Sequence, residues 1–232
     1  MSAPRLDLYT EVHKGLRAAL FEVSRLTGQV DWGDMDEVED LREAWLDLLE
    51  LLRAHVAHER DMVHPLLDLR LPGVARALNA DHELQEALLE DLEGHFEHLL
   101  EVDEAALRQA MGLEFYRGLN RFVALYLPHL HEEETRVMPS LWAVARPDEL
   151  AQALSAIIGS MSPELLLAYM DEMLPAINHH ERQLLLTGLQ HVAPAEVFDA
   201  VLDRAEEILS RAGWRKLERA MLAPTATELV EL

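Results

Sequence analysis

The sequence predicts an all-α protein, an antiparallel up-down four-helix bundle followed by a C-terminal helical extension. Apolar residues recur at spacings of three and four over long segments, where a strand would show strict alternation. The chain of 232 residues contains only 10 glycines and 10 prolines, so long helices are rarely interrupted. Four long segments with short connections are typical of an antiparallel bundle.

The four bundle helices are expected over residues 3–27, 37–69, 72–100 and 105–145. Gly28 and Gly33 lie in the loop that ends the first helix. Pro72 is expected in the first turn of the third helix, where its missing N–H costs nothing.

The extension is predicted as several shorter amphipathic helices after Pro147. Ser162 followed by Pro163 is a good N-cap and first-turn pair for one of them. We therefore expect a bundle over residues 1–146 and an extension over residues 147–232, frayed from Pro224 onward.

Composition excludes several classes of protein. The chain has 20 Lys and Arg against 43 Asp and Glu, a net charge of −23, whereas a nucleic-acid partner would require clustered positive charge. No cysteine is present, so disulfides, thiolate zinc sites and iron–sulfur clusters are impossible. No export signal and no apolar span of about 20 residues is seen, so we expect a cytoplasmic protein without a membrane partner.

A repeated histidine and glutamate pattern is the most informative feature of the sequence. Each half of the bundle contains a histidine, a glutamate four residues later and a proline six residues after that; one further histidine lies on the preceding helix. The first half contributes His13, His55, Glu59 and Pro65. The second half contributes His82, His129, Glu133 and Pro139.

This pattern predicts a metal site inside the bundle. Residues four apart share one face of a helix, and apolar residues such as Leu52 and Met62 fall close to the face of His55 and Glu59. Buried carboxylates are costly unless they are paired or bind metal, and two in one core repel each other. Four imidazoles and two bridging carboxylates suit a pair of iron or manganese ions, and the lack of sulfur ligands argues against structural zinc.

These residues resemble the hemerythrin-like, or HHE cation-binding, family over about residues 5–145. The resemblance implies a four-helix bundle holding a non-haem di-iron centre that meets dioxygen or related small oxidants. By position, His13 and His55 would bind one iron, His82 and His129 the other, and Glu59 and Glu133 would bridge them. A ferritin-like bundle would instead need Glu-x-x-His pairs, and the chain has none.

The chain departs from the oxygen-carrying members of this family at two positions. Glu86 stands where a fifth histidine ligand would lie, and Glu133 follows His129 by four residues where carriers place an aspartate five residues on. This oxygen-rich ligand set should favour ferric iron, so reversible oxygen carriage is not expected. Glu86 could be an added metal ligand, a hydrogen-bond acceptor for a ligand or a solvated side chain. His58, His64 and His131 are interpreted mostly as surface residues, although one of them could form a hydrogen bond to a metal ligand.

Three hypotheses for the function follow. The first is a di-iron protein, of the oxidase or peroxide-handling type, that reacts with dioxygen, peroxide or nitric oxide. The second is an iron or oxygen sensor in which the metal state controls docking of the extension. The third is a metal-free helical scaffold. The apolar faces of the extension could pack on the bundle, cap the metal site or form a homodimer, and these alternatives stay open.

Overall fold

The computed structural model describes residues 5–221, and these residues contain helices and turns but no strand. The bundle is built from α1 (Thr10–Gln29), α2 (Met35–His58), η1 (Glu59–Val63), α3 (His64–Arg70), α4 (Val74–Leu100), α5 (Ala105–Glu132), η2 (Glu133–Val137) and α6 (Met138–Val144). The expected all-α architecture is confirmed. The expected fraying after Pro224 lies outside the described residues.

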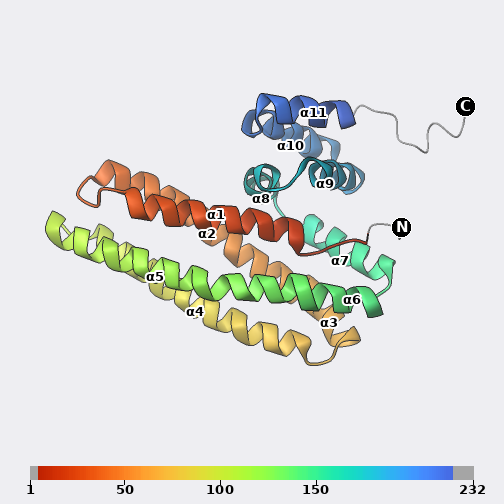
Figure 1. Cartoon of the computed structure of the whole chain (residues 1–232), viewed down its shortest axis with the longest axis horizontal. Coiled ribbons are helices and arrows are strands. Elements are labelled where there is room, and N and C mark those ends of the chain that lie inside the picture. Colours follow the sequence, from red (N-terminus) through yellow and green to blue (C-terminus); the bar gives the residue numbers. More distant parts are fainter. Residues whose placement is uncertain (1–4, 222–232) are drawn as a thin grey trace, which may run out of the picture. The chain divides into compact units, whose positions relative to one another are not determined.

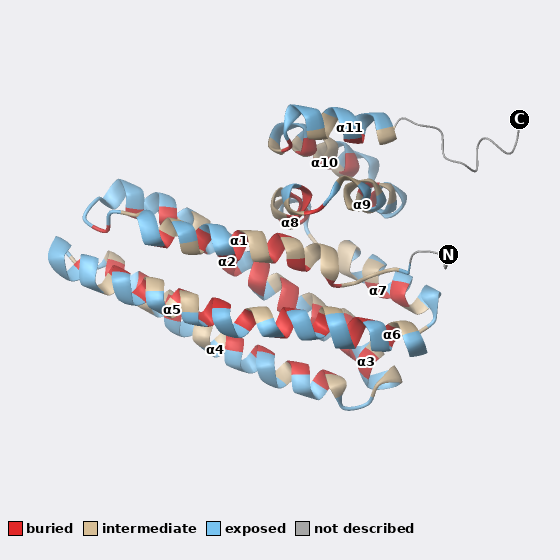
Figure 2. Ribbon diagram, viewed as in Figure 1, coloured by how far each residue is buried: buried red, intermediate tan, exposed pale blue. Residues whose placement is uncertain are grey.

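The bundle forms a closed ring of neighbouring helices. The helix α1 packs against α2 and α5, and α4 packs against α2 and α5, so consecutive long helices run antiparallel (Figure 1). Buried residues follow the inward face of each helix (Figure 2). This arrangement gives each ligand-bearing helix one stripe that faces the common core.

Three helix starts differ from those predicted, and one of them is α2, which begins two residues early at Met35. The first helix begins at Thr10 because the Asp7 carboxylate accepts hydrogen bonds from the backbone N–H groups of Tyr9 and Thr10, both at 2.9 Å, which forms a turn ahead of the helix. The third long helix begins at Val74. Gly73 precedes it with φ of 92°, a left-handed conformation that ordinary residues rarely adopt, so Pro72 lies in the turn before the helix.

The loop between α1 and α2 is anchored to α5 at one end of the bundle. Trp32 is 3% exposed and packs against α5 at Gly112, where an added Cβ would lie only 2.2 Å from the indole ring. The buried guanidinium of Arg108 donates hydrogen bonds to the carbonyl oxygens of Trp32, at 2.6 Å, and Val102, at 2.5 Å. These carbonyls satisfy donors that would otherwise be buried without partners.

The chain divides into two compact units, residues 1–157 and 158–232. The division falls later than the expected boundary after residue 146, because most of α7 (Pro147–Ser160) belongs with the bundle. Leu150 is part of an apolar cluster with Leu67 and Leu141, and Ile157 packs against the same cluster. The apolar face of α7 is therefore buried on the first unit.

The described part of the second unit, residues 158–221, contains the helices α8 (Pro163–Ala176), α9 (His179–Val192), α10 (Ala195–Ile208) and α11 (Arg211–Met221). The predicted cap of α8 is confirmed, since the Ser162 hydroxyl accepts a hydrogen bond from the Leu165 N–H at 3.2 Å. The helix α10 packs on α8 and α11 packs on α9, which buries Leu174, Leu186 and Leu217.

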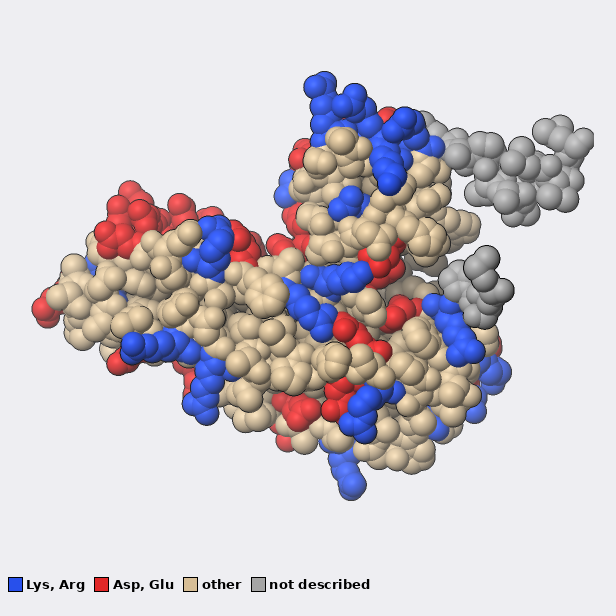
Figure 3. Space-filling model, in the orientation of Figure 1, with Lys and Arg blue, Asp and Glu red and all other residues tan. Residues whose placement is uncertain are grey.

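Basic side chains gather on α11, at Arg211, Arg215, Lys216 and Arg219 (Figure 3). No single helix among residues 5–221 is long and apolar enough to cross a membrane. The helices α7 and α8 reach the required length and hydropathy only when they are counted together, and the chain bends between them.

Candidate metal centre

The structure brings six predicted ligands together in the core of the bundle. His13 comes from α1, His55 from α2, His82 from α4 and His129 from α5, while Glu59 and Glu133 begin the π-helical turns η1 and η2. All six are buried, with at most 5% of each residue exposed. Four long helices and the two π-helical turns thus supply side chains to one place.

Glu59 divides its two carboxylate oxygens between two histidine pairs. Its Oε1 lies 3.2 Å from Nε2 of His55 and 3.9 Å from Nε2 of His13. Its Oε2 lies 3.2 Å from Nε2 of His82. A carboxylate placed in this way can bridge two metal ions.

Glu133 is arranged in the same way. Its Oε1 lies 3.3 Å from Nε2 of His129, and its Oε2 lies 3.5 Å from Nε2 of His13. The six side chains form two overlapping groups whose ligand atoms lie within 4.8 Å of one another, and both groups share the two carboxylates. One group adds His13 and His55, and the other adds His82 and His129.

The ligand atoms are better placed to bind metal than to form a hydrogen-bond network. Both oxygens of Glu59 and of Glu133, and Nε2 of His13 and of His55, are buried without a hydrogen-bond partner among the described residues. Two ligands at right angles on an ion with bonds of roughly 2.1 Å would lie about 3.0 Å apart. The shortest separations here, 2.9 Å between Nε2 of His82 and of His129 and 3.2 Å from His55 to Glu59, are close to that value.

Glu59 and Glu133 each start a π-helical turn. The backbone N–H of His64 bonds to the carbonyl of Glu59, and that of Met138 bonds to the carbonyl of Glu133, five residues back in each case. The next residue is Pro65 or Pro139, which has no N–H for an α-helical bond and disfavours α geometry in the residue before it. The repeated prolines therefore explain two π-helical turns that were not predicted, a feature frequent at functional sites.

Without a cation, the carboxylates and imidazoles perturb one another. Burial tends to lower the pKa of His13, but the hydrogen bond with Glu134 and the nearby negative charges of Glu59 and Glu133 outweigh it and raise that pKa to about 9. Burial lowers the pKa of His55 to about 3. Burial and then the charge of Glu59 raise the pKa of Glu133, which expresses the repulsion between two buried carboxylates.

The outer ring nitrogens of two histidines face carboxylates. Nδ1 of His13 lies 3.1 Å from Oε1 of Glu134, and Arg17 donates to the same oxygen at 2.5 Å. Although burial raises the pKa of Glu134, its bonds with His13 and Arg17 lower it to about 2. Nδ1 of His129 lies 3.4 Å from Oδ2 of Asp81. Such partners leave Nε2 of each ring available to a metal.

The structure does not bring Glu86 into the cluster. Its side chain is 39% exposed and both of its oxygens accept hydrogen bonds from Arg60, each at 3.1 Å. His64 is buried, at 2% exposed, so it is the histidine of the three flanking ones that does not lie at the surface. Its ring stacks on that of His82 with centroids 5.5 Å apart, and its Nδ1 lies 3.0 Å from Oδ1 of Asn79.

The fold and the site define a class: a helical bundle whose core holds histidine and glutamate clusters able to bind metal. The model of the hemerythrin HHE cation-binding domain matches residues 5–141. The chain therefore belongs to the hemerythrin HHE cation-binding family, and the resemblance stated from the repeat is confirmed.

One curated relative is the zinc finger protein BRUTUS of Arabidopsis thaliana, which is 23% identical over 184 residues. The match covers 79% of this chain but only 14% of that protein. No solved structure matches the chain.

Proposed function

We propose that the bundle holds two iron ions and reacts with a small oxidant, dioxygen, peroxide or nitric oxide. The single observation that supports this most strongly is the division of both carboxylates between two histidine pairs. Iron bound there would supply redox and Lewis-acid chemistry toward the oxidant.

The number and type of donors favour iron over structural zinc. Each group in the cluster offers two imidazole nitrogens and two carboxylates. Four donors close a tetrahedral zinc site, whereas an ion that prefers six ligands keeps positions for a small molecule. Manganese has a similar preference for oxygen and nitrogen ligands, so metal content is part of the test.

The surrounding side chains would keep bulk water from the cluster. Val63, Leu78 and Val137 each follow or precede a ligand by four residues and are at most 4% exposed. His13 and His129 would be oriented by Glu134 and Asp81. A site of this kind would admit small oxidants and exclude larger molecules.

An optical experiment tests the proposal. The protein is loaded with ferrous iron without air and then mixed separately with dioxygen, hydrogen peroxide and nitric oxide. We expect a new near-ultraviolet or visible absorption with at least one of them. The variant with both Glu59→Ala and Glu133→Ala should show none. A wild-type spectrum that matches free iron in the same buffer for all three oxidants would reject the proposal.

The sensor hypothesis remains as an alternative because residues 158–232 form a compact unit of their own. Both candidate metal groups among the described residues lie in the first unit. A sensor should change protease sensitivity or oligomeric state within residues 158–232 between the metal-free and iron-loaded forms. Identical patterns together with rapid peroxide turnover would favour the enzyme.

A further inference from the structure

A layer of four buried side chains closes one side of the metal cluster. It consists of Tyr9, Val63, Leu78 and Val137, which belong to one apolar cluster. Each lies four residues from a ligand, namely His13, Glu59, His82 and Glu133 respectively. The residue before α1, one residue of α4 and one of each π-helical turn therefore lie next to the ligands, and among these four only Tyr9 contributes a polar side-chain atom.

The hydroxyl of Tyr9 has no hydrogen-bond partner among the described residues. Tyr9 is 1% exposed, so water does not satisfy it from the surface. Its ring lies against that of His13, with centroids 5.5 Å apart. A buried hydroxyl without a partner is destabilising, and an unfilled donor beside a functional cluster indicates a ligand that the protein alone does not supply.

Two other buried groups beside the cluster offer acceptors instead of a donor. The unpartnered atom of Gln85 is its carbonyl oxygen Oε1. Nδ1 of His64 faces Oδ1 of Asn79, an acceptor, so the neutral ring carries its proton on Nδ1 and leaves Nε2 as a lone pair. Neither atom can donate to an anion, whereas the Tyr9 hydroxyl can.

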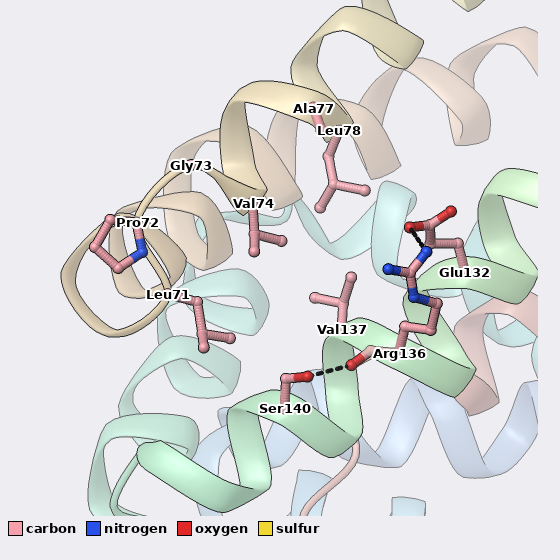
Figure 4. A pocket seen from close by; sticks show the side chains of 10 residues that line it. All are labelled: Leu71, Pro72, Gly73, Val74, Ala77, Leu78, Glu132, Arg136, Val137 and Ser140. Atoms are coloured by element: carbon pink, nitrogen blue, oxygen red, sulfur yellow. Dashed lines mark hydrogen bonds and ion pairs between the residues drawn. The ribbon is translucent and has the colours of Figure 1, made fainter.

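The same layer separates the cluster from a cavity of about 400 Å³ between the start of α4 and the η2–α6 segment. Leu78 and Val137 belong to the layer and also line the cavity, into which they point from its two sides (Figure 4). The cavity opens beside the ion pair of Arg136 with Glu132, 2.8 Å long. A small molecule in this cavity is therefore one side-chain layer away from the ligands.

We propose that Tyr9 donates a hydrogen bond to the small anionic ligand held at the dinuclear centre. The inference rests on the proposed di-iron function and names the residue that selects its ligand. The hydroxyl would favour ligands that carry an accepting oxygen or nitrogen over apolar molecules of the same size. Tyr9 acts here as a binding residue through its O–H and not as a metal ligand.

Azide binding to the iron-loaded protein tests this inference. Iron content is measured first, and azide is then titrated while the visible spectrum is followed. Tyr9→Phe should contain as much iron as the wild type, unfold at the same or a higher temperature, and bind azide about tenfold or more weakly, since one hydrogen bond to a charged group is lost. Tyr116→Phe is the matched control and should bind azide as the wild type does.

Several results would overturn the inference. One is an unchanged azide affinity in Tyr9→Phe at full iron content. A second is a loss confined to Tyr126→Phe, because Tyr126 precedes His129 on the opposite side of the ligands, with ring centroids 6.1 Å apart. A third is a phenolate-to-iron band in azide-free wild type that Tyr9→Phe removes, which would make Tyr9 a metal ligand. A wild-type protein without iron would reject the proposed function and this inference together.

Discussion

Nε2 of His82 lies 2.9 Å from Nε2 of His129, although the two rings come from the neighbouring helices α4 and α5. Both residues are buried, and the rings meet edge to face with centroids 4.7 Å apart. Two ring nitrogens at this distance either share one proton or direct both lone pairs at a cation. The adjacent oxygens of Glu59 and Glu133 make the cation the consistent choice.

Replacing Glu134 by glutamine should weaken iron binding without unfolding the protein. The charged acceptor that faces Nδ1 of His13 is lost, and such partners typically account for roughly 10- to 100-fold in metal affinity. Competition against a chelator measures the change. Glu132→Gln is the matched control, because Glu132 pairs with Arg136 at the surface. Equal iron affinities of the two variants would contradict the role assigned to Glu134.

The metal-free protein should lose stability as the pH rises from about 6.5, the usual pKa of an unfolded histidine, toward 9. The pKa of His13 in the folded protein is raised to about 9, and that of His129 is raised as well. A raised pKa in the folded state stabilises the protein below the unfolded pKa, and this contribution disappears as the pH rises through the folded value.

Urea unfolding at a series of pH values measures this effect. His13→Gln should make the free energy of unfolding less dependent on pH in this range. Bound iron should do the same, because it requires neutral imidazoles. His131→Gln, a change on the exposed face of α5, should leave the decline as it is in the wild type. A metal-free protein whose stability is constant between pH 6.5 and 9 would show that His13 is not held protonated.

Replacing Pro65 by alanine should reduce iron affinity roughly tenfold, a typical effect of misorienting a ligand. The new backbone N–H can bond to the carbonyl of Asp61 and favours an α-helical turn where η1 now lies. The carboxylate of Glu59 would then be misaligned with the histidines, while the metal-free protein loses no stability. Pro163→Ala, at the start of α8, changes a proline in the second unit and should leave iron affinity unchanged. If Pro65→Ala binds iron as tightly as the wild type, metal binding does not depend on the π-helical turn.

Two glycine substitutions should have opposite effects on stability. Gly112→Ala places a Cβ 2.2 Å from the ring of Trp32 and should destabilise the protein by about 1–3 kcal/mol through overpacking. Gly94→Ala lies in the exposed middle of α4 with no atom within 4 Å of the added Cβ and should stabilise by about 0.5–1 kcal/mol. Thermal unfolding measures both. A tolerated Gly112→Ala would mean that Trp32 is free to move.

The sequence predicted the bundle and the meeting of six side chains because helical periodicity alone determines which residues share a face. His55 with Glu59 and His129 with Glu133 are pairs four residues apart, and short connections place their helices, α2 and α5, on opposite sides of one ring, between α1 and α4. The repeat then placed the two pairs at the same level of the bundle. The distances between them could not be predicted, since they depend on how the helices pack.

Glu86 shows where periodicity misleads. It follows His82 by four residues, a rotation of about 40° along an α-helix, while Gln85 is rotated about 60° the other way. The structure turns Gln85 and then Leu89 toward the core, so Glu86 reaches the surface and pairs with Arg60. Choosing between the two neighbours requires the tilt of α4 against α2, which sequence does not contain.

The sequence could not single out His64 as the buried histidine because the π-helical turn was not predicted. In an unbroken α-helix, His64 would point about 140° away from Glu59. One additional residue in η1 removes about 100° of that rotation and brings His64 to the ligand side, against His82. The signal was present in Pro65, whose counterpart Pro139 follows the second glutamate at the same interval.

The iron content of the purified protein tests the central claim most directly. Protein loaded with ferrous iron and freed of excess metal should contain two irons per chain. Glu59→Ala should contain at most one, while Glu86→Gln should keep both. A wild-type chain that holds less than about one iron, or holds manganese or zinc in preference when all three are offered, would contradict a di-iron centre built from the two shared carboxylates.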